Sequence, residues 1–561
     1  MNSILSTIRY GFLNTLFKLK MALKGREYLK YSRRALGKPA EIQQSLLIDL
    51  LKKNRNTSFG KQHGFTTIKS LREYSKVVPL QDYESLRSYI TEQREKKTKA
   101  LTAEQPIMYA QTSGTTDEPK YIPVTPASLG FHKLNQGVFT WTQYRANPKA
   151  FSGRLLGFAG AAEEGYFSDG EPFGSISGVM YRNMPRLAQA KFIVPYPVFE
   201  LEDYELKYLL IARLALAEKN ITYVAAANPT TLLRLLTVIQ ENWKSLLADI
   251  ESGGFSGMES LPENVKKAVM PRFTPDSFRA WELQSFPAAK SPGFADIWPD
   301  LQIVVTWTGG SCGIALDVLK KDLATHTDIF DLGYVSSEFF GSITINSGHA
   351  QGLPTLYANI FEFVERNDWD EGVRDTIGLE RLEQDKEYQV IVTTSAGLYR
   401  YFMNDILRVS GFVGKTPLLA FVQKGKGVTS LCGEKLYESQ VIQAVQEISE
   451  ERLLKPHFYL MLADKLSNAY SLYCELHDPA DANVDNLSEL LDKKLMEINI
   501  EYDAKRHSGR LAPLRFVLLR PGAGESCKQF YLAQGRREQQ FKLITVQYRE
   551  DLEFPIEEHQ A

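Results

Sequence analysis

The feature that most constrains the fold of this chain is an alternation of short apolar runs with longer helical patterns between residues 100 and 415. Runs such as Ile221 to Ala227 and Tyr388 to Thr393 have the length of buried strands, whereas Tyr204 to Glu218 and Thr230 to Ile250 have the length and spacing of helices. Because helices that alternate with strands cover the faces of a sheet, this order predicts a large α/β domain.

The pattern changes at Gln423 to Gly427, where two glycines among charged residues follow an apolar run. Beyond this point helix-like and strand-like segments follow one another in an α-β-β-α-β order, which is enough chain for a separate α+β domain. The length of 561 residues also exceeds what one core usually organises. The sequence therefore predicts a large N-terminal domain with mixed sheets and helices at 1–424, with a helical segment at 1–45, and a smaller, mobile domain at 425–561.

Charge and cysteine content exclude several classes of protein. The chain has 66 Lys and Arg against 67 Asp and Glu, and this balance argues against a general electrostatic affinity for nucleic acid or for an acidic membrane. The four cysteines stand singly along the chain, unlike a disulfide framework or a zinc site. A reducing, cytoplasmic environment is expected.

The N-terminus has the pattern of an amphipathic helix, with basic residues Arg9, Lys18 and Lys20 opposite an apolar stripe. The stripe contains Ile4, Leu5, Ile8, Phe12, Leu13, Leu16 and Phe17. Charges interrupt it before it reaches the roughly 20 apolar residues that cross a bilayer, so no transmembrane segment is expected. We expect the helix to pack on its own domain, and peripheral contact with a membrane surface is the alternative.

The segment Tyr109 to Thr125 concentrates hydroxyl groups, a glycine and a lysine. Phosphate oxygens bind best to many short donors with little steric bulk. The candidate phosphate-binding residues are Ser113, Gly114, Thr115, Thr116 and Lys120. The spacing is not that of a Walker loop, and Tyr121 to Val124 predicts a strand where a Walker loop has a helix. A polar turn between two strands is the alternative interpretation.

Three later segments supply what a nucleotide site needs. Gly309 and Gly310 follow the apolar run Ile303 to Trp307 and would leave room for a base. Tyr334 offers a flat ring, and Glu338 offers a hard oxygen ligand for a divalent cation. Finally, the carboxylate of Asp405 can accept from both hydroxyls of a ribose, and Arg408 can pair with it or with phosphate. Taken singly, these residues are more typical of a core aromatic, a solvated charge and a structural ion pair.

Together and in this order, the motifs resemble those of the adenylate-forming superfamily of acyl-CoA synthetases, luciferases and peptide-synthetase adenylation domains. Thr393 to Phe412 and the early Asn56 to Phe65 are most similar to the auxin-responsive Gretchen Hagen three family of acyl acid amido synthetases, in its bacterial branch. The resemblance extends from about residue 45 into the C-terminal domain. One departure is Asn404, which replaces a usual glycine and tolerates the left-handed backbone.

The resemblance implies an ATP-dependent ligase in which a carboxylate attacks the α-phosphorus of ATP and an amine, commonly an amino acid, then attacks the acyl-adenylate. It implies that Ser113, Gly114, Thr115, Thr116 and Lys120 hold phosphates, that Gly309, Gly310 and Tyr334 contact adenine, that Glu338 binds Mg²⁺, and that Asp405 and Arg408 contact ribose and phosphate. Gly433 to Glu438 resembles the element that follows the hinge between the domains. In the late segment Gln539 to Lys542, Lys542 would neutralise the leaving pyrophosphate.

Two other functions stay open at this point. An acyl-CoA synthetase would share the first half-reaction and end on a thiol, although its usual C-terminal Gly-Lys signature is not evident. A nucleotide-binding protein without turnover is the second, although Lys120, Glu338 and Asp405 are all retained. No G-x-S-x-G or H-E-x-x-H pattern supports a hydrolase. The sequence names neither the acid nor the acceptor, and it leaves the oligomeric state open.

Overall fold

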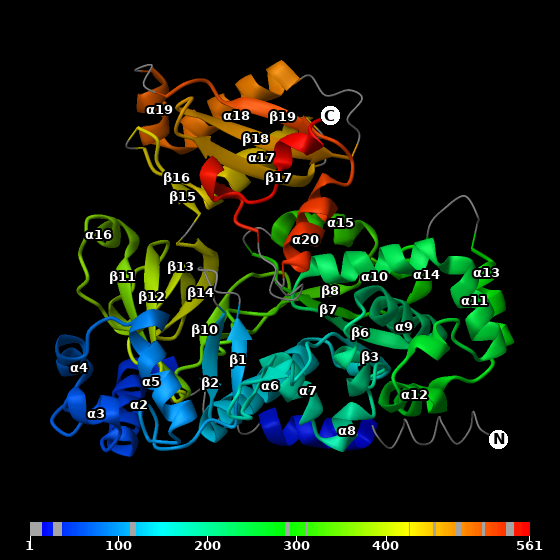
Figure 1. Cartoon of the computed structure of the whole chain (residues 1–561), viewed down its shortest axis with the longest axis horizontal. Helices are drawn as coiled ribbons and strands as arrows, with labels where there is room; N and C mark the ends of the chain where they lie inside the picture. The colour runs from blue at the N-terminus through cyan, green and yellow to red at the C-terminus, as the bar shows by residue number, and fades with distance from the viewer. Residues whose placement is uncertain are drawn as a thin grey trace. The chain divides into compact units, whose positions relative to one another are not determined.

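The computed structural model describes residues 14–25, 28, 36–112, 119–286, 292–309, 312–425, 427–432, 434–452, 456–477, 484–507, 511–534 and 543–561 (Figure 1). The chain divides into two compact units. The larger contains Met1–Thr308, Val318–Met403 and Arg408–Ala420, and the smaller contains Gly309–Asp317, Asn404–Leu407 and Phe421–Ala561. Both units combine helices with sheets, so the expected α/β class is confirmed.

A parallel four-stranded sheet forms the centre of the larger unit. Its order is β3 (Arg154–Gly157), β6 (Ile221–Ala225), β7 (Ile303–Thr306) and β8 (Asp328–Asp331). Every pair in it is parallel, and all four residues of β7 are buried, as expected for a sheet that is covered on both faces. The strand prediction at Ile303 to Val305 is therefore confirmed.

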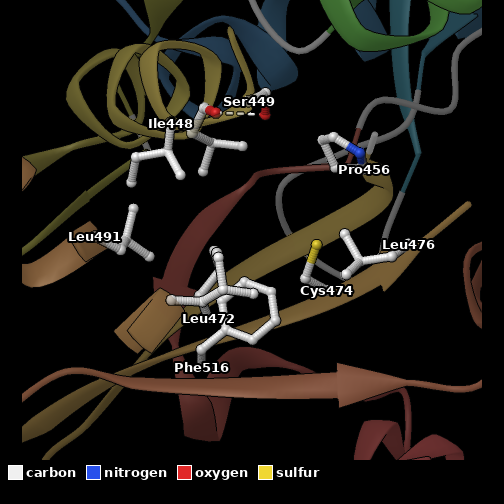
Figure 2. A pocket seen from close by; sticks show the side chains of 10 residues that line it. Ile448, Ser449, Pro456, Leu472, Cys474, Leu476, Leu491 and Phe516 are labelled. Atoms are coloured by element: carbon white, nitrogen blue, oxygen red, sulfur yellow. Dashed lines mark hydrogen bonds between the residues drawn. The ribbon is translucent and has the colours of Figure 1, made fainter. Parts of the chain in front are cut away.

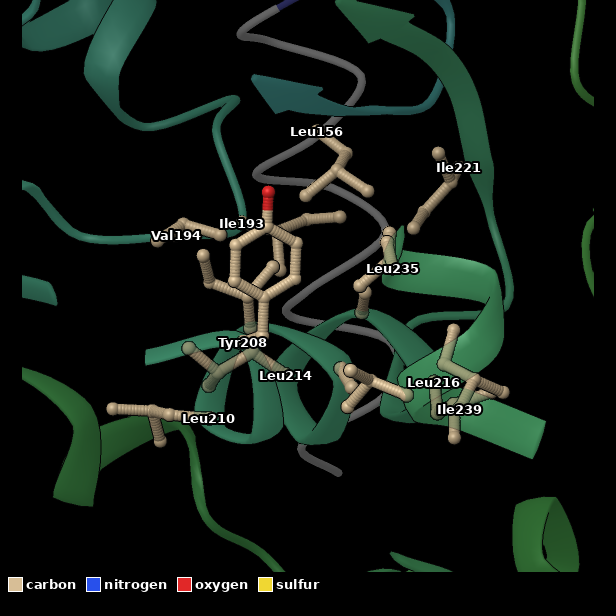
Figure 3. Close-up of a cluster of buried hydrophobic side chains, with 14 of the residues drawn as sticks. Leu156, Ile193, Val194, Tyr208, Leu210, Leu214, Leu216, Ile221, Leu235 and Ile239 are labelled. Carbon is tan, nitrogen blue, oxygen red and sulfur yellow. The ribbon is translucent and has the colours of Figure 1, made fainter. Parts of the chain in front are cut away.

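Alternate residues of these strands enter two different cores. Leu156, Val224 and Val304 belong to a large cluster with α9 (Tyr204–Ala217) and α10 (Pro229–Glu241), part of which is shown in Figure 3. Their neighbours Tyr223 and Ile303 belong to a cluster on the other face, with α6 (Pro126–Ala146). The period of two along each strand fixes this division.

One expected helix is two helices. The apolar pattern of Thr230 to Ile250 continues without interruption, but α10 ends at Glu241 and α11 (Trp243–Ser252) begins after Asn242. Asn242 has φ −106° and ψ 18°, and its side-chain amide donates to the Val238 carbonyl at 3.0 Å. An asparagine that bonds the backbone in this way favours a helix end over a helix interior.

Two more sheets belong mainly to the larger unit. A four-stranded sheet has the order β2 (Lys120–Val124), β1 (Met108–Thr112), β5 (Pro172–Gly174) and β4 (Gly165–Tyr166). A six-stranded sheet has the order β11 (Asn359–Glu365), β12 (Glu387–Thr394), β13 (Tyr401–Val413), β14 (Thr416–Lys424), β10 (Gly352–Pro354) and β9 (Ser342–Thr344). Further helices are α2 (Pro39–Asn54), α3 (Ser58–Gln62), α4 (Leu71–Val77), α5 (Tyr83–Glu95), α7 (Ile176–Arg182), α8 (Arg186–Gln189), α12 (Glu263–Val269), α13 (Ser277–Gln284), α14 (Phe294–Ile297), α15 (Cys312–Lys321) and α16 (Arg366–Asp370).

The smaller unit has a mixed sheet with helices on both faces. Its order is β19 (Arg515–Leu519), β18 (Ala469–Leu476), β17 (Pro456–Asp464) and β20 (Val546–Tyr548). Met461 and Leu472 face α17 (Glu438–Arg452) and α18 (Val484–Ile498), whereas Leu460 and Leu462 face α20 (Ala523–Ala533). The expected α-β-β-α-β order is present, and the structure adds α19 (Ile500–His507), α20 and β20.

The N-terminal helix, residues 14–25, packs on its own unit, as expected. Phe17 and Met21 are buried in the cluster that contains Phe139 of α6 and Phe151 of the short 3-10 helix η1 (Pro148–Phe151). Five apolar residues of the predicted stripe lie outside the described residues, namely Ile4, Leu5, Ile8, Phe12 and Leu13. Among the residues that the structure describes, no helix is long and apolar enough to span a bilayer.

Candidate functional site

The candidate phosphate loop joins two strands of a hairpin. β1 pairs antiparallel with β2, and Thr112 lies opposite Lys120, so the candidate loop connects the paired ends of the two strands. The expected strand at Tyr121 to Val124 is confirmed. Four of the candidate residues, Ser113, Gly114, Thr115 and Thr116, lie outside the described residues. The structure thus fixes the two ends of the loop, and Lys120 forms one of them.

Helix α5 and an aromatic cluster hold this hairpin. The hydroxyl of Tyr83 accepts from the Tyr121 backbone N–H at 2.9 Å, and the Lys120 Nζ lies 5.9 Å from the centre of the Tyr83 ring. Burial raises the pKa of Tyr83, which keeps its hydroxyl protonated. On the neighbouring strand, Phe173 packs edge-on against Tyr121 at 5.2 Å. Lys120 is therefore mounted on a rigid strand.

Asp331 organises the second and third candidate segments together, and the sequence did not single it out. Its carboxylate accepts from the backbone N–H and the hydroxyl of Thr308 at 2.7 and 2.6 Å, and from the Gly333 N–H at 2.7 Å. Thr308 follows β7 and Gly333 follows β8, and parallel neighbours end at the same edge of a sheet. One buried side chain thus fixes Thr308, which follows β7, relative to the start of the Tyr334 segment. Gly310 lies outside the described residues.

Tyr334 precedes a tight turn that contains Glu338. Val335 and Phe340 are bridge partners, and the Ser336 N–H donates to the Phe339 carbonyl at 3.0 Å. The Tyr334 ring is only 7% exposed and meets the Phe339 ring edge-on at 5.2 Å. A Cβ on Gly341 would approach the Tyr334 ring to 2.8 Å, so this close packing requires glycine. Glu338 is half-buried within the turn.

Asp405 is buried on β13, and the cation beside it is not the expected one. The Lys424 Nζ lies 3.9 Å from its carboxylate, whereas Arg408 is exposed three residues further along the strand. An odd separation puts two side chains on opposite faces of a strand, so Asp405 and Arg408 do not share a face. The tolerance expected of Asn404 is confirmed, since its φ is +54°.

Glu434 anchors the element that follows the predicted hinge, and sequence reasoning did not identify its role. It is 0% exposed and accepts from the backbone N–H groups of Leu431 and Cys432 and from the Tyr470 hydroxyl, each at 2.8 Å. The carboxylate therefore closes the turn on itself and ties it to β18. Lys542, the late candidate lysine, lies outside the described residues.

A pocket in the smaller unit does not suit phosphate. It lies among α17, α18 and the sheet, and its lining is almost entirely apolar (Figure 2). Its one hydroxyl, that of Ser449, already donates to the Val445 carbonyl at 2.6 Å. Cys474 in its wall has a raised pKa because it is buried, so its thiol stays protonated. The described residues also contain no group of three or more His, Cys, Asp or Glu arranged to hold a metal.

Comparisons with known proteins cover almost the whole chain. Three family models match in succession, described as the GH3 family N-terminal domain over residues 29–328, the GH3 family central domain over 352–424 and the GH3 family C-terminal domain over 439–550. Indole-3-acetic acid-amido synthetase GH3.4 of Arabidopsis thaliana is 25% identical over 545 residues, which cover 92% of this chain and 90% of that protein. Indole-3-acetic acid-amido synthetase GH3.8 of Oryza sativa subsp. indica is 24% identical over 537 residues, with 90% and 87% covered.

Solved structures share the fold. The GH3.15 acyl acid amido synthetase has a TM-score of 0.82 at 21% identity, with 95% of this chain and 96% of that chain covered. A 2-hydroxyisobutyryl-CoA ligase in the postadenylation state has a TM-score of 0.53 at 12% identity, with 91% and 90% covered. At these identities the likeness establishes architecture alone.

Proposed function

This chain belongs to the GH3 family, and from that membership we propose that it is an ATP-dependent ligase that converts a carboxylic acid to its acyl-adenylate and transfers the acyl group to an amine. The amine is proposed to be an amino acid. The observation that carries the proposal is the near full-length match to amido synthetases, which leaves no large part of either chain unmatched. Small-molecule substrates also agree with the balanced overall charge of the chain.

In the first half-reaction the hairpin turn would hold the phosphates. Lys120 would meet the negative charge that builds on the phosphate oxygens, and Ser113, Gly114, Thr115 and Thr116 would add short donors. The rigid mounting of Lys120 on β2 supports this role, because a preorganised cation stabilises developing charge without moving.

The nucleoside would be held by residues that follow β7 and β8 and by one residue on β13. Gly309, Gly310 and Tyr334 are proposed to contact adenine, and the Asp331 bridge supports this assignment because it fixes both turns together. Asp405 is proposed to accept from the ribose hydroxyls. The ammonium group of Lys424 lies 3.9 Å from this carboxylate. Arg408, which is exposed, is proposed to contact phosphate.

Glu338 alone would not bind Mg²⁺, so the ion would need the nucleotide as a second ligand. Glu338 would supply one carboxylate oxygen, and phosphate oxygens and water would complete the shell, as Mg²⁺ commonly requires. When bound, the ion would neutralise charge on the leaving pyrophosphate.

The smaller domain would serve both half-reactions. We propose that residues 425–561 move about the hinge, and that Lys542 neutralises the departing pyrophosphate before an amine attacks the anhydride.

The described residues include all four cysteines, none of which forms a disulfide, and this supports a cytoplasmic location.

Acid-dependent exchange of pyrophosphate into ATP tests the proposal. Aryl, indole and fatty acids would be screened with Mg²⁺ present, and the product formed with amino acids or with CoA would then be identified by mass. We expect one acid class to raise exchange and an amide to form. An acyl-CoA product would contradict the amide assignment, and folded protein without exchange for any acid would contradict adenylation.

A matched pair of lysine variants localises the chemistry. Lys120→Met is expected to lower exchange about 100-fold, the usual effect of removing one group that stabilises charge in a transition state. Lys52→Met, at an exposed position of α2, should leave exchange unchanged. Equal exchange activity in both variants would contradict the proposed role of Lys120 in the site.

A further inference from the structure

The N-terminal helix presents apolar residues on two opposite faces. Phe17 and Met21 point into the core, whereas Leu19 and Leu23 are 61% and 55% exposed. Residues two apart on an α-helix are separated by about 200°, so the second pair lies directly opposite the first. One face thus anchors the helix to the unit (Figure 1, dark blue), and the other presents two leucines outward.

Lysines flank the outward leucines. Lys18 and Lys20 stand on either side of Leu19 in the sequence, each about 100° away from it on the helix surface. The long stem of a lysine can lie along an apolar surface while its ammonium group reaches a polar layer beside it. Exposed leucines with lysines beside them are therefore suited to the boundary between an apolar and an anionic layer.

The two elements that hold the helix are also basic. The elements that hold the helix, α6 and η1, carry Lys133, Arg145 and Lys149, all exposed. Neither these two elements nor residues 14–25 contain an Asp or Glu. Over residues 1–38 the sequence has nine Lys and Arg and one Glu, a charge of +8, while the whole chain has −1. The rest of the chain therefore carries −9. Positive charge is concentrated in the first 38 residues although the whole chain is nearly neutral.

We propose that this face, formed by Lys18, Leu19, Lys20 and Leu23, binds the surface of an anionic phospholipid bilayer. A bilayer matches both properties, since acyl chains accept the leucines and anionic headgroups accept the lysines. A second copy would bring like charges together, and a nucleic acid would leave the leucines exposed to water. Since no described helix can span a bilayer, the contact is peripheral. The proposal does not depend on the catalytic one.

Flotation with vesicles tests it. The full chain is expected to float with phosphatidylcholine vesicles that contain phosphatidylserine and not with vesicles of phosphatidylcholine alone. The double variant Leu19→Gln/Leu23→Gln should bind the anionic vesicles about 10-fold more weakly, and added salt should weaken wild-type binding. Because both side chains are exposed, the variant should keep the wild-type melting temperature and exchange activity.

Leu466→Gln is the matched control, because Leu466 is a fully exposed leucine of the smaller unit, and it should bind as wild type does. Equal flotation with neutral and anionic vesicles, or full binding by the double variant, would overturn the proposal. So would a concentration-dependent rise in mass that the double variant abolishes, since the face would then bind a second copy.

Discussion

Two buried carboxylates in the larger unit show how the same charge can serve different ends. Glu362 on β11 is 2% exposed, and Asp331 at the end of β8 is 7% exposed. Glu362 is paired with the guanidinium of Arg400, whose Nε donates to both carboxylate oxygens at 3.1 Å. For Asp331 the donors are a hydroxyl and two backbone N–H groups of site loops. The first carboxylate is part of a core, and the second fixes the geometry of loops.

The partners of Arg400 explain the difference. Its Nη1 donates to the Ser75 and Val78 carbonyls at 2.7 and 2.6 Å, and its Nη2 donates to the Thr376 hydroxyl at 3.0 Å. The Arg400–Glu362 pair therefore joins the C-terminal end of α4 to the six-stranded sheet, two parts of the larger unit that are distant in sequence. Asp331 joins only the ends of two neighbouring strands. We expect loss of the first to lower stability and loss of the second to lower activity.

Arg400→Met tests the structural half of this comparison. It would leave Glu362 buried without its cation, so we expect a loss of about 3–5 kcal/mol in the free energy of unfolding, measured by urea denaturation. Exchange activity per folded molecule should stay close to wild type. Arg374→Met, at an exposed arginine over the Trp369 ring, is the control and should cost less than about 1 kcal/mol. If Arg400→Met lowered the free energy of unfolding by a similarly small amount, the pair would not be important for the stability of the core.

Asp331→Asn tests the other half. The amide keeps one acceptor oxygen and turns an NH₂ group toward backbone donors, so we expect a smaller stability loss of about 1–3 kcal/mol. Because both turns depend on this carboxylate, pyrophosphate exchange should fall by about 10-fold to 100-fold, mainly through the KM for ATP. Asp300→Asn is an exposed control. Loss of stability without any change in KM would make Asp331 a core residue like Glu362.

Glu434 sharpens the comparison, because its carboxylate is also held by backbone N–H groups but closes a single turn in the smaller unit. Glu434→Gln should cost about 1–2 kcal/mol. If the smaller domain serves the second half-reaction, as proposed, amide formation should fall several-fold while exchange stays within about 3-fold of wild type. Glu553→Gln, at an exposed position, is the control. Equal losses in both assays would contradict this division of labour.

Sequence periodicity identified several strands and helices of the fold because it is a local property. β7, β12 and α9 lie where apolar runs of the right length predicted them. The division between α10 and α11 was missed, since the apolar pattern continues across Asn242 and only a side-chain bond to the Val238 carbonyl marks the end. Element type was therefore predictable, and one boundary was not.

The supporting residues of the site could not be predicted for a different reason. Asp331 and Glu434 act through backbone groups that come near them only after strands pair and turns close, and a single carboxylate in the sequence carries no sign of this. The same holds for Lys424, which lies beside Asp405 where Arg408 was considered. The motifs predicted the residues that would touch a nucleotide, whereas the residues that position them emerge from the fold.

His132 of α6 represents a third response to burial, with neither a cation nor backbone donors. The described residues give its ring no hydrogen-bond partner, and burial lowers its pKa to about 4 from the usual 6.5. A folded pKa below the unfolded one means that the unfolded chain binds more protons between these values. His132 therefore favours the folded state fully above pH 6.5, and this contribution is lost as the pH falls toward 4.

His132→Leu should remove this acid dependence. Relative to its own stability at neutral pH, wild type should lose about 1 kcal/mol more than the variant at roughly pH 5.5, as measured by urea denaturation at several pH values. His326→Leu, at an exposed histidine, should keep the acid dependence of wild type. Parallel curves for wild type and His132→Leu would mean that His132 finds a partner once protonated. It would then belong with Glu362 and Asp331 as a compensated charge, and its burial alone would not distinguish it from them.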